Sequence, residues 1–95
     1  MAVYVIVNVE VKDPAAYERY RAGVPALIAK HGGEYLVRGG KPEVLEGSWN
    51  LSRVALLRFP DRAAAMAFME DPEYRPLKEL RHRVANTDIV AVEGV

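Results

Sequence analysis

The fold of this 95-residue chain is constrained most by two segments in which an apolar strand is followed by a capped helix. Every second position of residues 3–11 is valine, and this period of two predicts a β-strand with one apolar face. Asp13 follows as an N-cap with Pro14 at the first helical position, and a basic end closed by glycine completes a predicted helix over residues 14–31. The stretch "LLRFPDRAAAMAF" repeats this succession of features in the second half of the chain.

The remaining segments complete a small sheet around these two units. We predict strands at Tyr35–Arg38, in "SRVALLRFP" and in "TDIVAVEGV", a helix in "DRAAAMAFMED" capped by Asp61, and a short helix in "PEYRPLKELRHRVA". Two β-α-β halves of this kind form the ferredoxin-like βαββαβ split fold, an α+β architecture with a four-stranded antiparallel sheet and helices on one face. The length fits a single domain over residues 1–95. Because Pro25 lies inside the first helix, we also predict a kink or a break near residues 23–24.

Apolar residues occupy both faces of the predicted sheet. Tyr4 and Ile6 lie on the minority face of the first strand, and residues 54–57 and 89–92 are apolar on both sides. Helices on one face would leave these side chains in an apolar patch larger than monomers normally expose. We therefore predict a homodimer in which two chains pack sheet face to sheet face. The alternative is a monomer whose second face is partly covered by the loop 39–52.

Charge and cysteine content exclude several classes of function. Thirteen basic and thirteen acidic side chains cancel, so no global field favours nucleic acid or an anionic membrane surface as a partner. The absence of cysteine removes disulfides, thiolate nucleophiles and sulfur metal sites, and it fits a reducing compartment. The N-terminus alternates like a strand and shows no signal pattern, so we expect a mature cytoplasmic protein. We expect no cofactor and no metal, because neither His31 nor His82 has carboxylates at a ligand spacing.

Three arginines on predicted strands are the first candidates for binding a small molecule. Arg38, Arg53 and Arg58 come from neighbouring strand positions, and we expect them to converge on the uncovered side of the sheet. There they would either form salt bridges or hold a carboxylate or phosphate of a ligand in the guanidinium fork. The carboxylates available for such salt bridges are Glu10, Glu46 and Asp88.

Three further residues are candidates for the same site. Trp49 lies in a polar loop with no packing partner in the sequence, so it fills the dimer interface or walls a pocket. Tyr74 follows "DPE" at a helix start, where we expect it to reach the lip of a cavity. His31 ends the first helix, where it favours the macrodipole terminus or serves as an acid or base. The glycine pairs beside these residues mark turns, since no nucleotide-binding spacing is present.

Several short motifs together resemble a known family across essentially the whole chain. They are "GGEYLVRGG", "VLEGSW", Arg53, "FP", "DPEYRPLKELR" and the closing "VEG". In this order and spacing they are similar to the bacterial domain of unknown function 1330 family, which is assigned to the dimeric α/β-barrel superfamily and has no established activity. The family pattern falls on Gly33, Arg38, Gly39, Gly40, Glu46, Gly47, Trp49, Arg53, Phe59, Pro60, Pro72, Tyr74 and Arg81. The chain departs from it at "NLS" after the tryptophan and at Phe68-Met69.

The resemblance implies two alternative functions. The first is a metabolic enzyme that is monooxygenase- or isomerase-like and works in a cavity between sheet and helices, because the superfamily includes cofactor-free or haem-using monooxygenases and muconolactone-type isomerases. A small acidic or carbonyl substrate would then be bound and polarised by Arg38, Trp49, Arg53, Tyr74 and His31. The second is a non-catalytic dimer that binds a small molecule or another protein through the same cavity.

Overall fold

The computed structural model describes all 95 residues, which form four strands and three helices. The elements are β1 (Val3–Val11), α1 (Pro14–Lys30), β2 (Glu34–Gly40), β3 (Arg53–Phe59), α2 (Arg62–Glu70), α3 (Arg75–Val84) and β4 (Ala85–Glu93). Two helices begin at the predicted caps, because Asp13 accepts a hydrogen bond from the Ala16 N–H and Asp61 accepts one from the Ala64 N–H. No helix combines the length and the apolar character that crossing a membrane would require.

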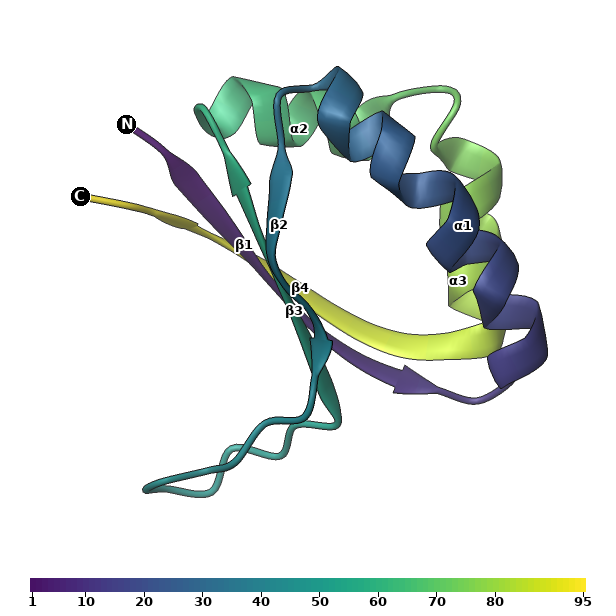
Figure 1. Cartoon of the computed structure of the whole chain (residues 1–95), viewed down its shortest axis with the longest axis vertical. Helices are drawn as coiled ribbons and strands as arrows, with labels where there is room; N and C mark the ends of the chain where they lie inside the picture. The colour runs from purple at the N-terminus through teal and green to yellow at the C-terminus, as the bar shows by residue number, and fades with distance from the viewer.

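The four strands form one antiparallel sheet in the order β2-β3-β1-β4. All three helices lie against one side of this sheet, and the other side is bare (Figure 1). The predicted α+β, ferredoxin-like fold is therefore confirmed, with α2 and α3 as consecutive helices in the second half.

The helix-facing side of the sheet supplies half of the core. Val3, Val5 and Val9 of β1 stand opposite Phe59, Leu57 and Arg53 of β3. The first two pairs are buried against side chains from the helices, whereas the third pair puts an arginine on the inner face at the open end of β3. The buried cluster comprises Val3, Val5, Val24, Leu27, Ile28, Leu57, Phe59, Ala65, Phe68 and Tyr74.

Helix α1 runs without interruption through Pro25, so of the predicted kink or break the break is wrong. Proline has no N–H, and in a helix its missing hydrogen bond is the one to the carbonyl four residues earlier, which is that of Arg21. This carbonyl is not left without a partner, because Arg38 Nη2 donates to it over 3.0 Å. A side chain from β2 thus replaces the bond that the helix itself cannot form.

Strand β2 is irregular, and the irregularity decides where its side chains point. Tyr35 pairs with Leu57, but Val37 pairs with the adjacent Leu56, so the register shifts within the strand. It shifts again before Gly40. Strict alternation would place Tyr35 and Arg38 on opposite faces, and the bulge lets both face the helices.

The uncovered side of the sheet is apolar and open. Val37 of β2 is 38% exposed, and Val90 and Val92 of β4 are 54% and 45% exposed. Ile6 of β1 and Leu56 of β3 lie on the same face, between β2 and β4. The segment 41–52 does not cover this side, since it projects beyond the end of the sheet (Figure 1).

Candidate functional site

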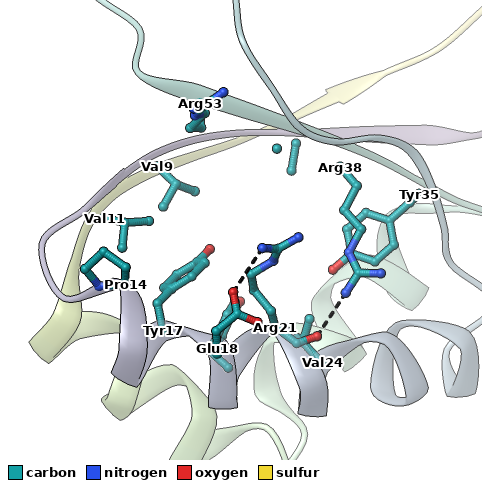
Figure 2. Close-up of a pocket in the computed structure, with 13 residues that line it drawn as sticks. Val9, Val11, Pro14, Tyr17, Glu18, Arg21, Val24, Tyr35, Arg38 and Arg53 are labelled. Atoms are coloured by element: carbon teal, nitrogen blue, oxygen red, sulfur yellow. Dashed lines mark hydrogen bonds and ion pairs between the residues drawn. The ribbon is translucent and has the colours of Figure 1, made fainter.

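A cavity of about 310 Å³ lies between the first half of α1 and the inner face of the sheet. It is bounded by the ends of β1 and β2 and by the start of β3 (Figure 2). Its lining residues are Val9, Val11, Pro14, Tyr17, Glu18, Tyr20, Arg21, Val24, Tyr35, Arg38, Gly39, Arg53 and Ala55. The cavity thus combines apolar walls with phenols and guanidinium groups.

Three arginines and one carboxylate give the cavity an excess of positive charge. Glu18 forms an ion pair with Arg21 over 3.1 Å, one turn along the same helix. Neither Arg38 nor Arg53 forms an ion pair with any carboxylate of the chain. Two guanidinium groups therefore face the cavity without a neutralising partner.

Arg38 is positioned by two contacts that leave its charge uncompensated. Its Cζ lies 5.0 Å from the centroid of the Tyr35 ring, within the range of a cation–π contact. Its Nη2 donates to the Arg21 carbonyl, so the side chain spans from β2 to α1 across the cavity (Figure 2). A neutral carbonyl and a ring face hold a guanidinium in place while keeping its remaining donors available.

The prediction that Arg38, Arg53 and Arg58 converge on the uncovered side is wrong. The β2 bulge turns Arg38 inward, and Arg53 lies opposite Val9 on the inner face of the sheet. Only Arg58 lies on the uncovered side, where it pairs with Glu34 over 3.7 Å. The proposed acidic partners also differ, since the Glu10 carboxylate accepts a hydrogen bond from the Asn86 amide instead.

Besides the charged groups, the phenols of Tyr17, Tyr20 and Tyr35 line the cavity as polar groups. Burial raises the pKa of each phenol above its ordinary value of 10.0, and the guanidinium groups nearby oppose this only in part. The three phenols are therefore protonated at neutral pH and available as hydrogen-bond donors. Tyr20 already uses its hydroxyl, which lies 2.7 Å from that of Tyr74.

Sequence reasoning missed the contributions of Tyr17, Arg21 and Tyr35. The first two are four residues apart on α1 and so share one helix face, which is a signal present in the sequence. Tyr35 precedes Arg38 by three positions, and only the bulge brings the two side chains together. Nothing in the strand pattern indicated that bulge.

Three predicted site residues do not line the cavity. Tyr74 is only 1% exposed and packs beneath α1 against Phe68, so it does not reach the lip of the cavity. Trp49 is 65% exposed in the projecting segment 41–52. His31 ends α1 at the opposite end of that helix, where its Nε2 lies 2.7 Å from the Asp71 carboxylate.

His31 belongs to an ion-pair cluster that joins helices. The buried Asp71 carboxylate also accepts from Lys30 Nζ over 2.9 Å and from the Glu73 N–H over 2.8 Å. The bonds from His31 and Lys30, followed by that of the Glu73 backbone, hold the pKa of Asp71 well below its ordinary value. No group of three or more His, Cys, Asp or Glu side chains is arranged to hold a metal ion.

Fold and site together define a ferredoxin-like α+β protein with a basic cavity between helix and sheet. Within that class, residues 2–95 match the family described as Domain of unknown function (DUF1330), and the chain belongs to this family. No curated protein matches the chain.

Solved structures share the fold at low sequence identity. A protein of unknown function from Rhodopseudomonas palustris has a TM-score of 0.79 and 18% identity, over 99% of this chain and 82% of that chain. SnoaB, a cofactor-independent oxygenase from Streptomyces nogalater, has a TM-score of 0.71 and 19% identity, over 99% and 93% of the two chains. A dimeric ferredoxin-like protein of unknown function from Jannaschia sp. CCS1 has a TM-score of 0.68 and 18% identity, over 99% and 100%.

Proposed function

We propose that the cavity binds a small molecule that carries an acidic or carbonyl oxygen, and that Arg38 and Arg53 hold this oxygen. The observation that carries the proposal is a pair of guanidinium groups without carboxylate partners, facing one cavity from β2 and β3. Arginine in this setting binds carboxylates and other planar oxygen groups through its fork of donors. The apolar walls supplied by Val9, Val24 and Ala55 suit the hydrocarbon part of such a ligand.

The cavity volume sets the size of the ligand. At about 310 Å³ it lies at the lower end of small-molecule sites, which range from roughly 300 to 1,000 Å³. This volume suits a compound of one ring or a short branched chain. Benzoate, with one apolar ring and one carboxylate, is therefore an appropriate first probe.

A second candidate function is catalysis on the bound molecule, of a monooxygenase or isomerase type. The observation that favours it is the set of protonated phenols in the cavity, because such groups can stabilise negative charge that develops on a carbonyl oxygen. SnoaB, which shares the fold, is a cofactor-independent oxygenase. In this chain the only carboxylate of the cavity is that of Glu18, so Glu18 would be the base once a ligand displaces it from Arg21.

We also propose that the protein is a cytoplasmic homodimer joined through the uncovered sheet faces. The exposed valines of β2 and β4 support this arrangement, since a two-fold contact would bury them. The dimeric character of the Jannaschia neighbour agrees with it. We assign Trp49 and the projecting segment 41–52 to the rim of this interface.

Calorimetric titration with benzoate, and with benzyl alcohol as the uncharged counterpart, tests the binding proposal. Benzoate binds and benzyl alcohol does not, and the variants R38M and R53M each weaken benzoate binding by about tenfold, as expected for one charge-assisted hydrogen bond. The variant R19M is the matched control, because Arg19 lies on α1, is exposed and does not line the cavity. Unchanged affinity in both R38M and R53M would refute the proposed site.

Turnover assays separate the two functions. Ligands that raise the melting temperature are incubated with the protein in air, and both their consumption and the uptake of oxygen are measured. Stabilisation without consumption assigns the protein to binding, whereas consumption that E18Q abolishes and R19M leaves intact assigns it to catalysis.

A further inference from the structure

Arg81 of α3 is a buried charge without a counter-charge. The residue is 4% exposed, and none of the ion pairs of the chain includes it. Its Nε is buried and has no hydrogen-bond acceptor. The one favourable contact of its guanidinium is with the ring of Tyr20, whose centroid lies 6.0 Å from Arg81 Cζ.

Arg81 lines a second, inner hollow of about 60 Å³. Of the fourteen residues around this hollow it is the only charged one, and thirteen are hydrophobic. Five of them also line the basic cavity, so the two spaces adjoin. The shared residues are Val9, Tyr17, Tyr20, Tyr35 and Ala55.

A lone guanidinium in such a place destabilises the empty protein. Removal of an ion from water remains strongly unfavourable even after the protein relaxes, and a cation–π contact at 6.0 Å offsets only a small part of this penalty. Thr87 Oγ1 is the other buried polar side-chain atom without a partner, and Thr87 stands opposite Val9 in the sheet. Both unpaired polar side chains thus lie on the helix-facing side of the sheet, and of the two only Arg81 lines the inner hollow.

We infer that Arg81 is an anion-binding group, and that the ligand places a second acidic oxygen, besides the one held by Arg38 and Arg53, against it in the inner hollow. The inference rests on the proposed function and deepens it, since it names the part of the ligand that enters first. A volume of about 60 Å³ corresponds to roughly two water molecules, enough for a carboxylate group or a phenolate oxygen but not for a ring.

The ligand class follows from the two adjoining spaces. The second acidic oxygen meets Arg81, the apolar body lies among Val9, Tyr17 and Ala55, and the oxygen of the proposed function meets Arg38 or Arg53 at the outer end. The class is therefore a small apolar or aromatic acid with a second oxygen function at the far end.

The stability of the unliganded chain distinguishes this role from a structural one. The variant R81M keeps the apolar stem of the side chain and removes the guanidinium group. Because the charge is uncompensated, R81M melts at a higher temperature than wild type while it binds terephthalate, an aromatic ring with a carboxylate at each end, about tenfold or more weakly. The matched control R83M, at an exposed position of the same helix, changes neither quantity. An R81M variant that melts lower and binds terephthalate like wild type overturns the inference.

A bromide soak locates the site without any organic ligand. Crystals of the full chain are soaked in sodium bromide, and the anomalous signal is expected within hydrogen-bonding distance of the Arg81 guanidinium and absent in R81M. Bromide at Arg38 or Arg53 but not at Arg81 overturns this inference and leaves the outer site standing. Bromide at Arg81 together with unchanged benzoate affinity in R38M and R53M supports the inference and refutes the outer site.

Discussion

Replacement of Pro25 by alanine tests the link between helix α1 and the cavity. In the native chain the Arg21 carbonyl accepts from Arg38, because Pro25 offers no N–H. In P25A the new backbone N–H at position 25 competes for that carbonyl, and Arg38 returns to solvent. The variant is thus expected to improve the helix and loosen the ligand site at the same time.

The size of the stability change follows from three opposing contributions. Proline costs about 3 kcal/mol relative to alanine inside a helix. Against this, proline stabilises by restricting the unfolded chain, by up to about 1 kcal/mol. The bond from Arg38, which is exposed, contributes about another 1 kcal/mol. P25A should therefore be more stable than wild type by about 1 kcal/mol, equivalent to roughly 4–8 °C in melting temperature for a domain of this size.

A double-mutant cycle with R38M makes the reasoning refutable. In the native background R38M deprives the Arg21 carbonyl of its partner, whereas in P25A that carbonyl is already bonded. The coupling between the two sites should be about 1 kcal/mol in urea denaturation, measured at one protein concentration for all four chains. P25A should also weaken benzoate binding, because Arg38 is no longer held. A destabilised P25A, or equal costs of R38M in both backgrounds, would show that the Arg38 bond does not replace the missing helical one.

Three further predictions concern the core, the ion-pair cluster and the interface. In G33A the new methyl group would lie 2.6 Å from Phe59 Cε1, so we expect a loss of about 1–3 kcal/mol in urea denaturation. The Asp71 carboxyl has a folded-state pKa below its ordinary value of 3.8, so the stability that it contributes to the folded protein is complete above about pH 5. This stability is lost as the pH falls through the folded-state pKa, and melting temperatures of D71N should lack this decline. V90K places a charge on the uncovered sheet face and should give a monomer in light scattering, whereas M66K on the helical layer should stay dimeric; a monomeric wild type would refute the interface.

Much of the fold was predictable because its signals are local. The alternating valines, the caps at Asp13 and Asp61 and the glycine that ends α1 each act within a few residues of where they stand. The break predicted at Pro25 was wrong because the helix is completed there by a residue that is distant in the sequence. The partner that satisfies the Arg21 carbonyl comes from another element, and no local rule contains it.

The site was predictable only in part, because the face of a strand depends on register. Arg38 and Arg53 were identified as residues that would form salt bridges or hold a ligand, but they were placed on the wrong side of the sheet. The burial of Arg81 gave no signal, since it is followed by His82 and Arg83 in a basic segment whose sequence is typical of a solvated helix. Its environment comes largely from β1 and α1, which are distant in the sequence.

The bulge in β2 decides on which face of the sheet the Arg38 side chain lies. A strand of the same length that paired without the bulge would keep the core contact of Tyr35, yet strict alternation would rotate the Arg38 guanidinium to the bare face. Such a chain would fold normally, lose a ligand contact and gain a charge in the surface that we expect to dimerise. The register of this one strand therefore decides between two different proteins with the same architecture, and relatives that lack the bulge in a β2 of the same length should differ in assembly as well as in ligand.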